Sequence, residues 1–226
     1  MTADGVREAA AEAAEASGRP SSELLRAGMR LVRLYAASRR VLAAVTATAA
    51  CAIGLRITLF GHWDSYGALQ LPLIFEAGAA AAIGITTAST FGDLERAAGQ
   101  WLPFLRLAAV LTLTAVAASV LAGAGIGAHL AGGTLDVLRN VAGMTGIGLL
   151  CAAAVGGSLA WVGTTGYLLL GVYGLYTQWH RPALTTPWIW PARPPHDLGA
   201  AICAGLVLTL GTALITMRGA RDPVGE

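Results

Sequence analysis

Long apolar stretches constrain the fold of this chain more than any other feature of its sequence. A helix rises about 1.5 Å per residue, so about twenty apolar residues cross a hydrocarbon layer roughly 30 Å thick. Inside lipid every backbone polar group must be bonded within the protein, so such stretches predict helices. We expect an all-α polytopic membrane protein with six transmembrane helices, at about residues 41–60, 69–90, 103–123, 137–155, 160–177 and 198–217.

The fourth and fifth of these helices come from one nearly continuous apolar run. Residues 137–176 make up about forty residues, which is about twice the length of a single crossing. The sequence GGSLAWVGTTG, residues 156–166, supplies turn-forming residues in its middle. This pattern predicts a tight helical hairpin.

Composition supports the membrane class and excludes some chemistry. The chain is 55% hydrophobic and 12% charged, with a mean hydropathy of +0.62, values that are unusual for a soluble domain. All fifteen basic residues are Arg, a bias that indicates a GC-rich bacterial genome. Without Lys the chain cannot form a phosphate-binding P-loop or a Schiff base.

The region before the first span has two parts. Residues 1–20 are rich in Ala and Glu, lack the apolar run of a signal peptide, and predict a flexible tail. Residues 21–40 predict an amphipathic helix that lies in the interface, with arginines near anionic lipid headgroups; the alternative is a cytosolic helix packed on a partner. Its apolar residues recur at helical spacing, and its arginines occupy another face: Leu24, Leu25, Leu31, Val32 and Tyr35; Arg26, Arg30 and Arg33.

The distribution of Arg predicts the orientation in the membrane. With the N-terminus in the cytoplasm, eleven of the fifteen arginines fall inside, and only Arg56, Arg139, Arg181 and Arg193 fall outside. Cytoplasmic loops carry the excess of positive charge. We therefore expect both termini, including the tail at residues 218–226, on the cytoplasmic side of a bacterial plasma membrane.

A short charged stretch, FGDLERAAGQWL, separates the second and third spans. Under the predicted orientation this stretch, residues 91–102, lies on the cytoplasmic side and is a place for contact with a soluble partner. The alternative is a solvated loop. Its candidate contact residues are Phe91, Asp93, Leu94, Glu95, Arg96 and Trp101.

The segment between the fifth and sixth spans, residues 178–197, has an unusual composition. It holds five of the nine Pro and three of the six Trp, namely Trp179, Trp188 and Trp190. Proline excludes a regular helix, and Trp favours the membrane interface. We expect a structured external cap that lies on the bilayer surface.

Among the ionisable residues inside predicted spans, Arg56 and Glu76 are the first candidates for a functional role. Counting about 1.5 Å per residue puts them at depths about 5 Å apart on neighbouring helices. An ion pair between them is the expected arrangement, either as a link between spans or as a switch or substrate site. The alternative is that Arg56 extends outward to the interface.

No constellation of residues predicts catalysis or a bound metal. The four His residues lack the i, i+3 or i, i+4 spacing of a helical metal site. Ser158 follows two glycines, but every His falls on the opposite side of the predicted membrane, so no general base is near. No nucleotide-binding or zinc motif and no nucleic-acid patch is present. We therefore expect a chain that is not an enzyme.

The layout resembles the membrane (permease) subunit of the type 2 family of ABC exporters. The shared features are an interfacial helix (LLRAGMRLVRLYAASRRV), two spans, the cytoplasmic connector FGDLERAAGQWLP, a third span, a close hairpin, an external segment and a last span. The resemblance covers residues 21–217. It rests on topology and on the character of the loops.

This resemblance implies a transport function with a separate energy source. The connector at residues 91–102 would be a coupling helix that contacts a cytoplasmic ATP-binding subunit, which would hold ATP and Mg, and this chain would bind no cofactor itself. A second permease, either a copy or a homologue, would complete the transporter. The alternative function is a membrane sensor or an accessory subunit of a larger membrane complex, without transport activity.

Overall fold

The structure is a computed structural model that describes residues 40–61, 67–88, 102–128, 130, 132–180, 186–218 and 220, with the side chains of 178–180 left out. The predicted tail lies outside these residues. So do the predicted interfacial helix, except for Arg40, and the connector at residues 91–102, except for Leu102.

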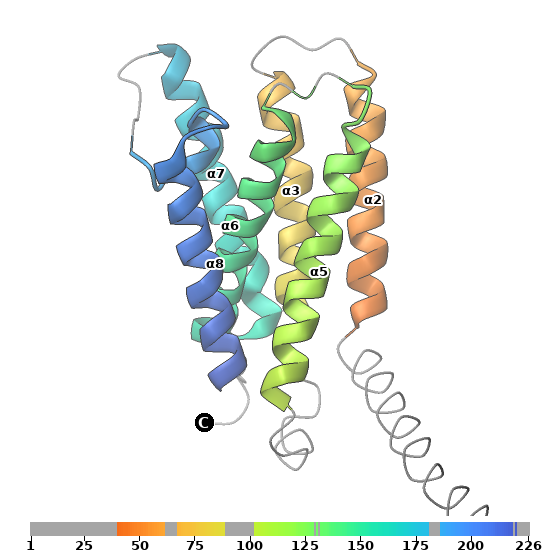
Figure 1. The fold of residues 1–226 in the computed structure, drawn as a ribbon, viewed down its shortest axis with the longest axis vertical. Coiled ribbons are helices and arrows are strands. Elements are labelled where there is room, and N and C mark those ends of the chain that lie inside the picture. The colour runs from red at the N-terminus through yellow and green to blue at the C-terminus, as the bar shows by residue number, and fades with distance from the viewer. Residues whose placement is uncertain are drawn as a thin grey trace, which may run out of the picture. The chain divides into compact units, whose positions relative to one another are not determined.

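The described residues form an all-α fold with no strand, as predicted (Figure 1). Six of the helices are long and apolar enough to cross a membrane. Two short 3-10 turns, η2 (Gly157–Leu159) and η3 (Trp190–Ala192), accompany them. The six long helices are α2 (Val41–Leu59), α3 (Gly67–Ile85), α5 (Leu102–Ala124), α6 (Gly133–Val155), α7 (Ala160–His180) and α8 (Leu198–Arg218).

Two helix ends differ from the predicted spans by more than three residues. Helix α3 ends at Ile85, although apolar sequence continues to about residue 90. Here Thr86 donates its hydroxyl to the Ile83 carbonyl at 2.6 Å, and Thr87 bonds in the same way to Gly84 at 2.7 Å. The backbone tightens at the same place, because the N–H groups of Thr86 and Thr87 bond to carbonyls three residues earlier, at 3.0 Å and 3.1 Å. Helix α6 starts earlier than predicted, at Gly133, which has a left-handed φ of 71°.

The helices alternate in direction, so that chain reversals gather at the two ends of the bundle. The start of α2, the end of α3, the start of α5, the turn between α6 and α7, and the end of α8 lie at the lower end in Figure 1. We call this the hairpin end. The turn between α5 and α6 and the η3 segment lie at the opposite end, which we call the η3 end.

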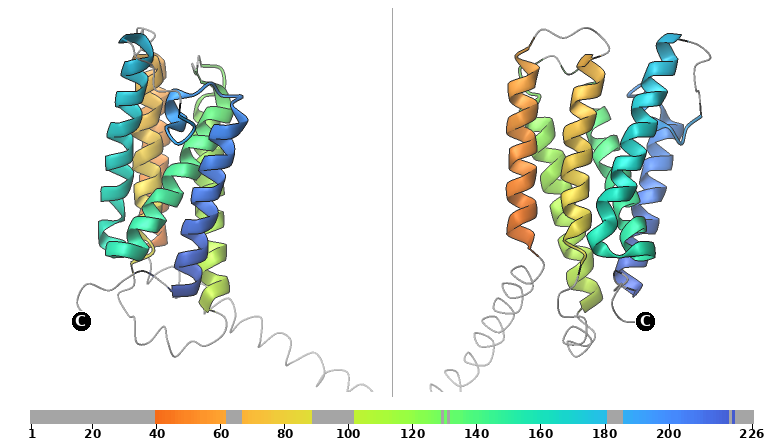
Figure 2. Two further views of the ribbon diagram at one scale, coloured as in Figure 1. Left: turned by 90° about the vertical axis from the view of Figure 1, so that its left-hand side faces the viewer. Right: turned by 180° about the vertical axis from the view of Figure 1, so that it is seen from behind.

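Helix α6 occupies the centre of the bundle (Figure 2). It packs against α3, α5, α7 and α8, and its contact with α8 is the most extensive in the fold. Helix α2 packs mainly against α3 and α5. Four of its residues, spaced three or four apart on one face, are buried: Ala44, Thr48, Ala52 and Leu55.

Glycine makes the close contact between α6 and α8 possible. A Cβ on Gly146 would lie 2.5 Å from the Leu208 backbone nitrogen, and a Cβ on Gly211 would lie 2.6 Å from the Gly146 carbonyl oxygen. Helices inside lipid gain no hydrophobic attraction for one another, so they associate through such close backbone packing. The interface between α6 and α8 is therefore a direct backbone contact.

The turn between α6 and α7 is as short as the sequence predicted. Gly156 ends α6 with φ 117°, a conformation that only glycine adopts easily, and η2 follows at once. A Cβ on Gly157 would lie 2.5 Å from the backbone of Ala88, just beyond α3. The hairpin therefore rests directly on the end of α3.

The segment before α8 packs into the bundle at η3. Trp190 is only 2% exposed and stacks on Tyr167 of α7, with ring centroids 4.4 Å apart. Its ring fills the space that Gly143 of α6 leaves open, since a Cβ there would lie 2.6 Å from the indole Cε2. The Trp190 side chain therefore packs inside the bundle and does not project from the segment. Trp188, by contrast, is 51% exposed.

Candidate functional site

A polar recess between α3 and α6, near the η3 end, is the candidate site. It measures about 250 Å³, including the part that opens to the outside. Helix α3, helix α6 and the turn that precedes α6 form its walls, which combine apolar side chains with three polar ones, Glu76, Asp136 and Asn140. The apolar side chains come from Ala68, Leu69, Pro72, Leu73, Leu130 and Val137.

Glu76 is the most deeply buried ionisable group of the recess. It is the tenth residue of α3, about 14 Å along the helix from its start at about 1.5 Å per residue. Its side chain is 1% exposed, and its Oε2 atom has no hydrogen-bond partner. The Asn140 side chain is its hydrogen-bonding neighbour. A buried carboxylate with a free oxygen is costly unless something compensates its charge.

Asn140 also has a side-chain oxygen that lacks a hydrogen bond. It is 5% exposed, and its Oδ1 atom has no hydrogen-bond partner. Glu76 and Asn140 thus present one free oxygen each in the same recess. Buried acceptors are usually satisfied by a hydrogen-bond donor, a water molecule or a cation, so these two oxygens mark the recess as a candidate binding site.

Asp136 forms the third polar wall and is already paired. Its Oδ1 atom accepts a hydrogen bond from Arg139, one helical turn further along α6, and the two side chains form an ion pair. The carboxylate lies over Gly132, where a Cβ would come within 2.7 Å of its Cγ. Glycine at position 132 therefore makes room for the Asp136 carboxylate.

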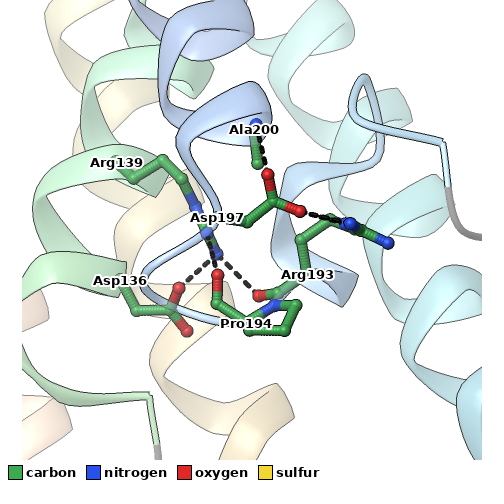
Figure 3. A network of polar contacts seen from close by, with 6 residues as sticks. All are labelled: Asp136, Arg139, Arg193, Pro194, Asp197 and Ala200. Carbon is green, nitrogen blue, oxygen red and sulfur yellow. Dashed lines mark hydrogen bonds and ion pairs between the residues drawn. The ribbon is translucent and has the colours of Figure 1, made fainter.

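Arg139 links the recess to the segment before α8 (Figure 3). Its Nη1 donates to the Pro194 carbonyl at 2.8 Å, and its Nη2 donates to the Arg193 carbonyl at 3.1 Å. Its side chain is buried, and the two carbonyls and Asp136 hold the charge in place. One guanidinium thus joins α6 to residues 193–194.

The same network continues to the start of α8. The Arg193 side chain pairs with Asp197, and the Asp197 Oδ1 atom accepts a hydrogen bond from the Ala200 backbone at 3.1 Å (Figure 3). Asp197 is thus the N-cap of α8. This backbone hydrogen bond and the one from Arg193 lower the pKa of Asp197 below its ordinary value.

The predicted ion pair between Arg56 and Glu76 is not formed. Arg56 donates instead to the carbonyls of Ala124 at 3.1 Å and Ile126 at 2.7 Å, at the end of α5. Its guanidinium also lies 5.0 Å from the centre of the Phe60 ring. Arg56 therefore ties α2 to α5, while Glu76 faces α6. Arg56 and Glu76 were predicted at similar depths, but they face different helices of the bundle.

The other predicted site residues are dispersed or lie outside the described part. Phe91, Asp93, Leu94, Glu95, Arg96 and Trp101 lie outside it, and the Trp179 side chain is not described. Trp188 and Trp190 are on the same segment but differ in exposure, as described above. The hydroxyl of Thr145, at the centre of α6, is buried without a partner, whereas Ser158 is exposed.

Sequence reasoning missed Asp136 and Asn140 as site residues and treated Arg139 only as an outside charge. A signal was present, because the spacing i, i+3 and i+4 puts these three polar residues of α6 on one face. The predicted fourth span started at residue 137, so Asp136 was assigned to the loop and its shared helical face with Arg139 and Asn140 was not recognised.

The described residues that line the recess offer oxygen ligands and include no His, Cys or Met, the side chains that transition metals favour. Among the described residues no group of three or more His, Cys, Asp and Glu is placed to hold a metal ion. Two carboxylates and one amide oxygen are hard ligands, which suit simple cations. The described residues of the recess also include no hydroxyl or thiol nucleophile.

Comparison with known proteins identifies no relative. No protein-family model, no curated protein and no solved structure matches the chain.

Proposed function

We propose that this chain is the permease subunit of an ATP-driven exporter of the ABC type. It would move a substrate outward by alternating access, with ATP bound and hydrolysed on a separate cytoplasmic subunit. The order of the elements is the observation that carries the proposal: two long helices, a connector, a third helix, a tight α6–α7 hairpin, a segment packed back into the bundle, and a last helix. This order is the one on which the resemblance to type 2 exporters rests.

In this proposal the connector at residues 91–102 contacts the ATPase. It joins α3 to α5, and both helices meet it at the hairpin end of the bundle (Figure 1). Asp93, Glu95 and Arg96 would make polar contacts, and Phe91, Leu94 and Trp101 would anchor the apolar side. Since the chain has no Lys, the P-loop must belong to the partner. A second permease copy or homologue would complete the assembly.

The test is capture of the ATPase from the native host. The tagged full-length chain should co-purify a protein with P-loop ATPase activity, and the combined substitution D93A, E95A and W101A should abolish that capture. Trp188→Ala, at the opposite end of the bundle, is the matched control and should retain it. Capture that persists in the triple variant would show that residues 91–102 are not the coupling element.

The second candidate function is that of a sensor or an accessory subunit without transport activity. The exposed indole of Trp188 favours it, since exposed aromatic side chains are common recognition elements. In that case the wild-type chain would capture no ATPase, and Trp188→Ala would remove its partner.

A further inference from the structure

We propose that the recess between α3 and α6 binds a monovalent cation, either an inorganic ion such as Na⁺ or the primary ammonium group of an organic amine. This proposal concerns the chain's own residues and does not depend on the exporter assignment. It rests on charge balance, on free oxygen atoms and on the size of the recess.

Charge balance sets the valence of the cation. Asp136 and Arg139 form an ion pair and together contribute no net charge. Among the described residues no cation forms an ion pair with Glu76, because Arg56 bonds to the end of α5 and Arg139 is paired with Asp136. An ionised Glu76 therefore leaves one uncompensated negative charge in the recess. One monovalent cation neutralises it, whereas a divalent ion would leave an excess positive charge in an apolar setting.

The free oxygen atoms supply the ligands. Glu76 Oε2 and Asn140 Oδ1 are both buried and unbonded, and both residues line the recess. The Asp136 carboxylate, held over Gly132, adds a further oxygen beside them. Oxygen atoms from carboxylate and amide groups suit both a hard monovalent ion and the N–H donors of an ammonium group.

The recess has the right size and access. Its interior has room for about one water molecule. A bare alkali ion or an ammonium head fits this space, and a larger organic cation such as choline does not. The recess is not enclosed, because its volume includes space open to the outside. An ion can therefore enter from the η3 end without unfolding of the bundle.

The alternative is that Glu76 is a permanently protonated, neutral acid. A neutral acid needs no cation, and Gln would then replace it without consequence. An ionised Glu76 instead makes the protein's stability depend on the cation present, because a ligand that binds only the folded state stabilises it. The two possibilities are thus distinguished by the response to salt.

The experiment measures thermal unfolding of the purified full-length chain in detergent micelles at one pH and one ionic strength. The chloride salts of sodium, potassium, methylammonium and choline are compared. We expect a saturable rise in Tm with at least one of the first three salts relative to choline, about 5 °C at a concentration about a hundredfold above the Kd. A response to an inorganic ion alone assigns the site to that ion, and a response to methylammonium alone assigns it to an ammonium group.

Three variants make the test decisive. Glu76→Gln, which keeps the size and removes the charge, should abolish the shift. Asn140→Val should raise the half-saturating concentration at least about tenfold, since it removes one charge-assisted contact. Asp197→Asn is the matched control, because it makes the same carboxylate-to-amide change at the same end but outside the recess, and it should keep the wild-type shift. Equal Tm values in all four salts for the wild-type chain, or a shift that survives in Glu76→Gln, would overturn the proposal.

Discussion

Helices α6 and α2 differ most in the share of their residues that is buried inside the bundle. In the stretch of membrane-spanning length, 61% of α6 is buried inside the protein, against 22% of α2. The buried helix carries Asp136, Arg139 and Asn140 together with the glycines that let α8 approach. The peripheral helix turns large apolar side chains outward, of which Leu42 is 77% exposed.

This contrast reverses the rule for soluble proteins. In water the most apolar helix goes to the centre, but in lipid an apolar side chain gains nothing by turning inward. Polar groups and glycines are what require a protein neighbour. In this chain the helix with the charged pair and the close glycine contacts is the central one, and α2, whose surface is apolar, faces outward.

The largest expected effect is on Trp190, which packs between α6 and α7. Trp190→Ala should lower the free energy of unfolding by about 4 kcal/mol, because it opens a cavity beside Gly143 and Tyr167. Denaturant titration in micelles would measure it. Trp188→Ala, which removes the exposed indole of the same segment, should cost less than about 1 kcal/mol. Equal losses would mean that the η3 segment is not part of the core.

Arg139 of α6 and Arg56 of α2 offer the next comparison. Arg139→Gln should cost about 3 kcal/mol, because it leaves Asp136 buried without its partner. Arg56→Gln loses two bonds to carbonyls at the partly exposed end of α5 and should cost about 1 kcal/mol. The same titration checks both. A larger loss for Arg56 would mean that α2 contributes more to stability than its burial indicates.

Glycine substitution tests the contact between α6 and α8. Gly146→Ala should cost about 2 kcal/mol, because the new methyl group meets the backbone of α8 and neither helix can move without losing contacts. Gly205→Ala is the matched control on α8, since a Cβ there meets nothing within 4 Å. The control should be neutral or slightly stabilising, by up to about 1 kcal/mol. Thermal unfolding of the two variants side by side measures the difference.

The smallest expected effect is a pH dependence at the start of α8. The pKa of Asp197 is lowered by the Ala200 backbone hydrogen bond and by Arg193, so its contribution to stability is complete above its ordinary pKa of about 3.9. That contribution is lost as the pH falls through the lowered value. The Tm of the wild-type chain should therefore fall more steeply below about pH 4 than that of Asp197→Asn. Parallel curves for the two proteins would contradict the N-cap role.

The sequence was sufficient to predict the number of long helices and the hairpin. Both depend on the hydropathy and the length of the apolar stretches, because a stretch long enough to cross the bilayer must bond its own backbone by forming a helix. It was less informative about where helices end. At the end of α3 the backbone of Thr86 and Thr87 turns to bonds with carbonyls three residues earlier, and Gly133 starts α6 with a left-handed φ. Neither feature has a hydropathy signature.

The candidate site was harder to predict because it depends on how each helix is rotated about its axis. Residue counting put Arg56 and Glu76 at similar depths but could not show that one faces α5 and the other α6. The burial of Trp190 depends on Gly143, nearly fifty residues earlier in the chain, where a missing side chain makes room for the ring. Composition alone favoured the membrane interface for this residue.

The contact between Gly157 and Ala88 has a mechanical consequence. No side chain separates the backbone of the α6–α7 hairpin from the residue that follows the last turn of α3. Side chains usually absorb small displacements by changing rotamer, and neither Gly157 nor Ala88 has a side chain that can do so. A displacement of the chain at Ala88 therefore acts on the turn that follows the central helix through a close backbone contact.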